Sequence, residues 1–133
     1  MKLSSEKKLI NSTNEKIFQL VSNCSQFGKY LPSDVTNIET TADFCKFEMK
    51  SIAQFKIEIT EKSPNSLVVY NVGNDKNIPI ELKINIQDNQ GTSFAELELQ
   101  ADIPFFLQGM VKSPLQKFID ILIEKIKIES EKV

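Results

Sequence analysis

Few side chains of this 133-residue chain could carry out acid–base or nucleophilic chemistry. The sequence has no His and no Arg, so it lacks the usual near-neutral acid or base and the planar fork that grips carboxylates and phosphates. Its two cysteines, Cys24 and Cys45, stand far apart and match no metal-binding or redox spacing. We therefore expect no bound metal and no cofactor, and we expect both thiols to be reduced and mostly buried.

The inward positions predicted by strand alternation carry no charge, which bears on catalysis. Acid–base catalysis needs a titratable group inside the pocket, and the candidates are Cys45 and Tyr70. A lone inward cysteine is more often a small core residue than a nucleophile, because nothing in this pattern would activate it. The segment around Tyr70, Leu67 to Val72, is too apolar to assign a facing. The residues thus favour a protein that performs no catalysis, and an enzyme that uses Tyr70 or a stray acid stays open as the alternative.

Most of the chain reads as strands with one dry and one wet face. Apolar and polar residues alternate in short segments that are separated by turn residues, which is typical of an antiparallel sheet whose dry face needs a helical cover. The segments predicted to be strands are Lys2–Ile10, Val35–Thr41, Phe44–Met49, Ala53–Thr60, Leu67–Val72, Ile78–Gln87 and Ser93–Ala101.

Two short helical segments are expected between the first and second strands. Ser12 followed by Glu15 matches a capping box, in which a hydroxyl and a carboxylate each bond an otherwise unpaired backbone N–H. A second helical turn is predicted over Ser25–Leu31, and Pro32 ends it.

A long amphipathic helix over Asp102–Glu129 closes the sequence. Its apolar residues recur every three or four positions, and at 1.5 Å per residue the helix would be about 39 Å long. Pro114 lies inside the pattern, so a kink or a short break is predicted near Ser113, because proline removes a backbone hydrogen bond. A curved sheet around such a helix would form a container.

The order of these elements resembles that of the START-like, or SRPBCC, superfamily, which includes bacterial polyketide cyclases and birch-pollen-allergen-like proteins. The local match is Ile10–Ser22, a strand end followed by a small cap, a Glu and an apolar pair, together with Phe27–Pro32, an aromatic-rich segment that ends in proline. The resemblance implies one α+β domain, residues 1–133, with a helix-grip fold. In that fold a curved antiparallel sheet of about six or seven strands wraps on the long C-terminal helix, and two short helices follow strand 1.

The resemblance, together with the uncharged inner face, predicts an apolar small molecule or lipid bound between the sheet and the C-terminal helix. Flexible methionines and an apolar lining suit a loosely selective ligand. The same side chains could instead fill the core, leaving an interaction module, and a polyketide cyclase or aromatase-type enzyme is the other alternative. The predicted ligand-binding residues are Phe47, Met49, Phe55, Ile57, Tyr70, Leu82, Leu97, Leu99, Phe106, Met110, Val111 and Phe118.

Charge and hydropathy exclude other classes of function. The net charge of −2 argues against nucleic-acid binding. Charged residues interrupt the C-terminal helix, so stable membrane insertion is not expected, and its acids nearly balance its lysines, which disfavours a membrane-surface helix. The polar first ten residues contain no secretory signal, so we expect a cytoplasmic protein, either a monomer or a homodimer.

Overall fold

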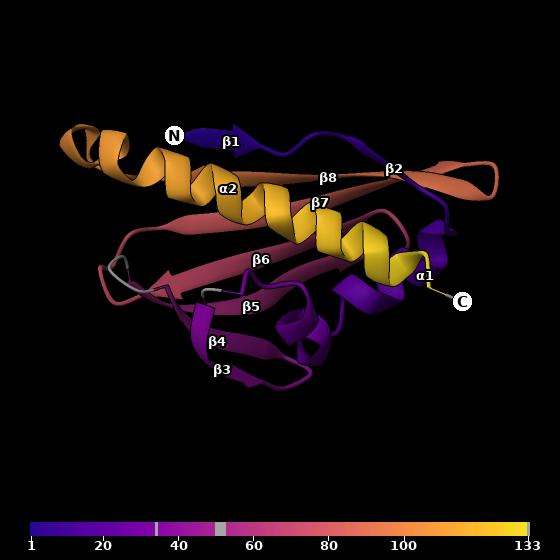
Figure 1. Ribbon diagram of the computed structural model, residues 1–133, viewed down its shortest axis with the longest axis horizontal. Coiled ribbons are helices and arrows are strands. Elements are labelled where there is room, and N and C mark those ends of the chain that lie inside the picture. Colours follow the sequence, from indigo (N-terminus) through magenta and orange to yellow (C-terminus); the bar gives the residue numbers. More distant parts are fainter. Residues whose placement is uncertain (34, 50–52, 133) are drawn as a thin grey trace.

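The computed structural model describes residues 1–33, 35–49 and 53–132. It has a curved, open antiparallel sheet that faces one long helix, α2, and two short helical segments, α1 and η1 (Figure 1). This is the α+β helix-grip architecture that the sequence predicts. The sheet order is β1-β8-β7-β6-β5-β4-β3, and β2 also pairs with β8. The strands are β1 (Lys2–Ser4), β2 (Lys8–Ile10), β3 (Val35–Thr40), β4 (Phe44–Met49), β5 (Ala53–Ser63), β6 (Leu67–Asn74), β7 (Ile80–Asn89) and β8 (Thr92–Ala101).

The alternation of apolar and polar residues along the strands correctly predicts which face of the sheet is buried. In β7 the apolar residues Ile80, Leu82, Ile84 and Ile86 are buried, and the residues between them are exposed or half-buried. The same pattern holds in β8, where every second residue from Ser93 to Ala101 is buried. In β6 the pattern is less clean, because Val68, Val69 and Tyr70 are all buried in sequence. This explains why no facing can be assigned to that segment from alternation alone.

The first strand is split, and the side chain of a serine takes part in the pairing at the break. β1 and β2 both pair with β8, but a gap at residues 5–7 separates them. Within this gap the buried Ser5 donates its backbone N–H to the carbonyl of Leu97, and its hydroxyl accepts from the N–H of Leu97, both at 2.9 Å. A side-chain oxygen therefore replaces one backbone acceptor at this sheet edge.

Both short helical segments form where expected, but the first cap lies one residue later than predicted. Helix α1 spans Asn14–Val21, and its N-cap is Thr13, whose hydroxyl accepts from the N–H of Lys16 at 3.2 Å. The capping box that begins at Ser12 is therefore wrong. The carbonyl of Ser12 instead accepts a hydrogen bond from the hydroxyl of Ser93. The 3-10 helix η1 spans Cys24–Lys29 and is capped by the side chain of Asn23.

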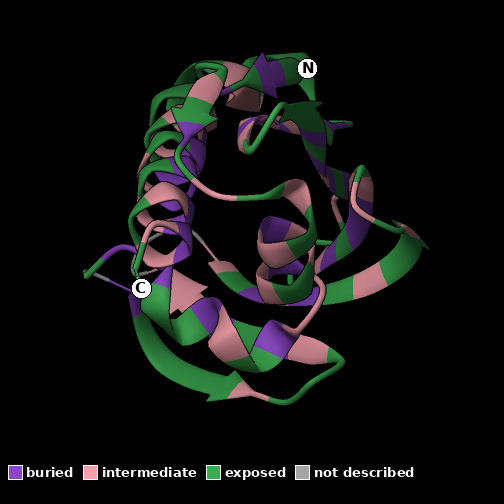
Figure 2. Cartoon of the chain, turned by 90° about the vertical axis from the view of Figure 1, so that its right-hand side faces the viewer, coloured by how far each residue is buried: buried purple, intermediate pink, exposed green. Residues whose placement is uncertain are grey.

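Helix α2 spans Phe105–Ser130 and is buried along only part of its length. It continues through Pro114, so the short break considered near Ser113 is wrong. None of its residues from 105 to 114 is buried. From Leu115 onward a regular inward stripe is buried, and this stripe faces the sheet (Figure 2). The buried residues of α2 are Leu115, Phe118, Ile119, Leu122, Ile123, Ile126 and Ser130.

Candidate apolar ligand site

We call the space between the curved sheet and α2 the grip. Aromatic side chains fill its middle. The ring of Phe47 on β4 stacks on Phe118 of α2, with centroids 5.7 Å apart and planes 12° apart. Phe47 also stacks on Phe55 of β5 at 5.5 Å. These three rings connect the sheet to the helix, and we call them the aromatic floor. Eight of the residues predicted to bind a ligand are buried in the core: Phe47, Phe55, Ile57, Tyr70, Leu82, Leu97, Leu99 and Phe118.

One end of the grip is less closely packed, and we call it the open end. Because neighbouring strands are antiparallel, the end of β4, the start of β5, the end of β6 and the start of β7 meet at one side of the sheet. The end of β8 and the first turns of α2 lie at that same side (Figure 1). Apolar side chains at these positions pack against the core but are only half-buried. They are Met49, Ala53, Ile78, Leu107 and Val111.

A hydrogen-bonded loop holds one wall of the open end in place. The side-chain amide of Asn74 donates to the carbonyl of Ile78 at 2.7 Å, and its oxygen accepts from the N–H of Ile78 at 3.0 Å and of Lys76 at 3.2 Å. Asn77 adopts the left-handed conformation (φ 56°), which asparagine tolerates better than most residues. The loop is therefore a defined turn that fixes the position of Ile78 beside the site.

Two of the predicted ligand-binding residues do not face the core. Phe106 is 79% exposed and Met110 is 73% exposed, so the prediction that they face inward is wrong. Leu107 and Val111 point inward, and their preceding neighbours are rotated by about 100° around the helix. Among the predicted residues, Met49 and Val111 lie at the open end. Ala53, Ile78 and Leu107 were missing from the predicted set, although alternation or helical spacing marks each as inward.

Tyr70 and Cys45, the two residues considered for catalysis, are buried in the core. The hydroxyl of Tyr70 donates to the backbone carbonyl of Val21, and burial raises its pKa well above the ordinary value. Burial also raises the pKa of the Cys45 thiol to about 12, with a smaller contribution from the nearby Cys24. The pKa of Cys24 is raised to about 11, mainly by burial and then by the charge of Asp43. At neutral pH both thiols are protonated and weakly nucleophilic.

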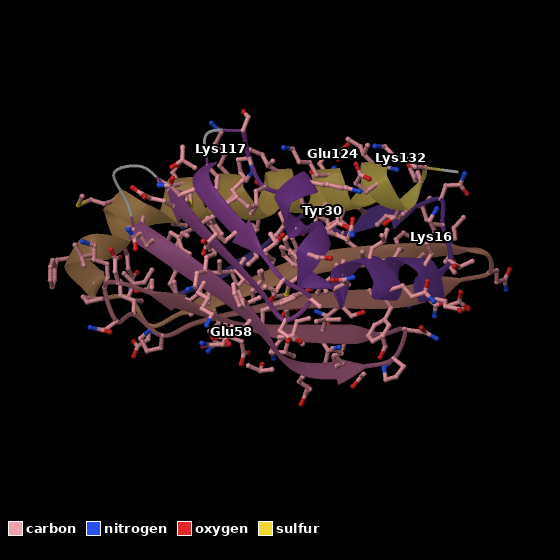
Figure 3. The ribbon with its side chains drawn as sticks, turned by 90° about the horizontal axis from the view of Figure 1, so that it is seen from below. Lys16, Tyr30, Glu58, Lys117, Glu124 and Lys132 are labelled. Atoms are coloured by element: carbon pink, nitrogen blue, oxygen red, sulfur yellow. The ribbon has the colours of Figure 1, made fainter. Side chains whose placement is uncertain are left out.

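Tyr30 is a further buried titratable group, which the sequence patterns did not single out. Its side chain is fully buried, packs edge-on against Phe27 at 5.6 Å, and lies beneath the C-terminal part of α2 (Figure 3). Within the described part of the chain, its hydroxyl and that of Ser130 have no hydrogen-bond partner. Burial raises the pKa of Tyr30, and the carboxylate of Glu129 raises it further. Tyr30 is at the opposite end of α2 from the open end.

A groove of about 980 Å³ lies on the outer side of α2 rather than between helix and sheet. Figure 3 labels Lys117 and Glu124 on this side of the helix. Lys8 closes part of it by an ion pair of 3.2 Å with Glu124. Most of its lining residues are charged or polar, although the surface that they present to the groove is mainly apolar. Across residues 1–33, 35–49 and 53–132, no three His, Cys, Asp or Glu side chains gather as a metal site requires.

Comparisons with known proteins identify solved structures that share this fold. No protein-family model and no curated protein matches the sequence. Among solved structures, the KanY protein has a TM-score of 0.80 at 14% identity, with 99% of this chain and 98% of KanY covered. A START superfamily protein from Mycobacterium smegmatis has a TM-score of 0.72 at 12% identity, with 98% and 97% covered. The chain has the START fold.

The START fold also relates this chain to a protein that forms a dimer. The Aha1 dimer from Colwellia psychrerythraea has a TM-score of 0.63 at 14% identity, with 98% of this chain and 96% of Aha1 covered. At such identities the likeness concerns the fold, and function must be argued from the site. In the described part of this START-fold chain, no helix is both long and apolar enough to cross a membrane.

Proposed function

We propose that this START-fold protein binds an apolar small molecule or lipid at the open end of the grip, without transforming it. The ligand would lie between the first turns of α2 and the neighbouring strand ends, above the aromatic floor. Ligand sites are typically concave, mostly apolar and lined by few polar groups. Leu107 and Val111 would contact it from the helix, and Met49, Ala53 and Ile78 from the sheet.

The observation that carries the proposal is the change in packing along α2. From Leu115 onward the inward side chains are buried, whereas Leu107 and Val111 on the same stripe are only half-buried. The helix thus extends about ten residues past the closely packed core and presents apolar surface above the strand ends. Covering that surface with an apolar ligand would remove it from water, at roughly 25 cal/mol for each Å².

The positions of Tyr70, Cys24 and Cys45 support binding rather than catalysis by these groups. The hydroxyl of Tyr70 already donates to the carbonyl of Val21, and the raised pKa values of Cys24 and Cys45 keep both thiols protonated. None of these three groups belongs to the half-buried set at the open end. A cyclase-type reaction would need an acid or base next to the ligand.

The proposal is tested by ligand recovery and by a charge placed in the site. The purified protein is extracted with organic solvent, the extract is analysed by mass spectrometry, and thermal shifts are measured with fatty acids, sterols and quinones. We expect a stabilising ligand for the native chain and no stabilisation of Val111→Lys. The matched control is Ile128→Lys, at a half-exposed position of the same helix. An empty extract together with no thermal shift across the panel would refute the proposal.

A further inference from the structure

The first two turns of α2 carry a cluster of exposed apolar side chains. Phe105, Phe106 and Met110 are 89%, 79% and 73% exposed, and we call them the apolar tip. The other large apolar side chains exposed in the described part of the chain are Leu9, Ile38 and Ile128, each at most 50% exposed and each on a different segment or far along the helix. Scattered apolar residues are ordinary, but a contiguous exposed set marks an interaction surface.

The apolar tip is held away from the core by its own connections. Ile103, just before the helix, is buried, and its carbonyl accepts from the side-chain amide of Gln108 at 3.1 Å. The helix then begins after Pro104, whose carbonyl accepts from the N–H of Leu107 at 2.9 Å. The first turns of α2 lie at one end of the molecule (Figure 1). With Ile103 buried and Leu107 turned inward, the side chains of the tip are left exposed at that end.

Charge is distributed unevenly along α2. Residues 105–117 contain Lys112 and Lys117, both exposed, and no acidic residue, while the exposed Asp102 precedes the helix by three residues. The first acid of the helix is Asp120, and Glu124 and Glu129 follow in the C-terminal half. The near balance of charge over the whole helix therefore conceals a cationic N-terminal half beside the apolar tip. Aromatic side chains next to lysines suit the interface of an anionic bilayer.

We propose that the apolar tip docks this protein reversibly on an anionic phospholipid surface. The side chains of Phe105, Phe106 and Met110 would enter the headgroup region, and Lys112 and Lys117 would lie near the lipid phosphates. A second copy of the chain fits the tip less well, because stable interfaces bury about 800 Å² on each partner and three side chains supply only part of that area. Docking requires no ligand, so this inference goes beyond the proposed function. Docking through the apolar tip would turn the open end toward the bilayer.

Vesicle sedimentation tests the proposal with the native chain and matched variants. The probes are vesicles of phosphatidylcholine alone and vesicles that also contain phosphatidylglycerol. We expect the native chain to sediment mainly with the anionic vesicles, and less so at high salt. The double variant Phe105→Ser/Phe106→Ser should partition at least about tenfold more weakly, since two aromatic side chains are lost. The control Leu9→Ser/Ile128→Ser, which also removes two exposed apolar residues, should sediment like the native chain.

Two outcomes would overturn the inference. One is equal sedimentation of the tip variant and the control variant, with circular dichroism showing that both are folded. The other is a concentration-dependent dimer in vesicle-free sedimentation velocity that the tip variant abolishes, which would assign the tip to a second copy of the chain. The ligand experiments contain no vesicles, and the tip variant should still bind ligand, so a failure of docking is distinguishable from a failure of the proposed function.

Discussion

The hydroxyl of Tyr70 donates a hydrogen bond to the backbone carbonyl of Val21, which joins the middle of β6 to the last residue of α1. Val21 is in the last turn of α1, where backbone carbonyls have no partner within the helix. The bond therefore satisfies a helix-end acceptor inside the core, and the Tyr70 ring packs edge-on against Phe27 at 5.3 Å. Tyr70 thus has a structural role that accounts for its burial and for its raised pKa.

A matched pair of tyrosine variants tests this role. Tyr70→Phe leaves the carbonyl of Val21 buried without its donor, so we expect the free energy of unfolding to fall by about 1–2 kcal/mol. Tyr30→Phe removes a buried hydroxyl that has no partner in the described part of the chain, so it should be neutral or stabilising. Urea unfolding followed by circular dichroism measures both. If Tyr30→Phe destabilised the protein as much as Tyr70→Phe does, the assignment of the two hydroxyls would be wrong.

A second matched pair tests the aromatic floor. Phe118→Ala should lower the free energy of unfolding by about 3–5 kcal/mol, because it removes the ring that stacks on Phe47 and leaves a cavity. Phe105→Ala, on the same helix but 89% exposed, should change it by no more than about 0.5 kcal/mol. Similar losses for both variants, measured by chemical denaturation, would show that α2 does not hold its buried stripe as described.

Both thiols should be unreactive in the folded protein. Burial raises the pKa of Cys45 to about 12 and that of Cys24 to about 11, so at pH 8 each is protonated as well as shielded from reagent. With Ellman's reagent we expect no rapid reaction in buffer and two equivalents after unfolding in urea. Rapid labelling of either cysteine in the native state would contradict its burial.

The C-terminal end of α2 should contribute a pH-dependent part of the stability. The backbone N–H of Asn11 donates to the carboxylate of Glu131 at 2.9 Å, Lys127 pairs with it at 2.6 Å, and together they lower its pKa below the ordinary 4.5. A lowered pKa means that the contribution is complete above the unfolded-state value and is lost as the pH falls through the folded-state value. Glu131→Gln should therefore unfold at a slightly lower temperature at pH 7.

That difference in melting temperature should shrink below about pH 4.5 and vanish once Glu131 is protonated in both states. Thermal unfolding measured between pH 3 and pH 7 follows it. Glu61→Gln, a charge change at the exposed end of β5, serves as the control. A difference between Glu131→Gln and the native chain that persists unchanged at pH 3 would contradict the charge-based explanation.

The strands and the inward stripe of α2 were predictable because their signals are local. Period-two alternation identifies the buried positions of β7 and β8, and helical spacing places Leu115, Phe118 and Leu122 inside. The exchange at Ser5 could not be read in the same way, because the hydroxyl there replaces a backbone acceptor of its own strand and accepts from the N–H of Leu97 on the distant strand β8. The choice of Thr13 over Ser12 as N-cap is equally hidden, because both residues carry a suitable hydroxyl.

The site was predicted less completely than the fold. Alternation shows that Phe47 points inward, but it cannot show that the ring meets Phe118 and fills the middle of the grip. The apolar character of Phe106 and Met110 suggested an inward position, whereas their place beside the inward Leu107 and Val111 turns them to solvent. Which inward residues remain half-buried depends on how far α2 extends past the packed core, and that is a tertiary property.

The most direct measurement uses the absence of tryptophan from this chain. Leu107→Trp places the only indole at the open end, and Ile128→Trp places one at a half-exposed position on the same helix. Each variant is titrated with a brominated fatty acid, which quenches indole fluorescence on contact. We predict strong, saturable quenching of Leu107→Trp and weak, non-saturable quenching of Ile128→Trp. Equal quenching of both variants, or none of Leu107→Trp, would contradict an apolar site between the helix and the sheet.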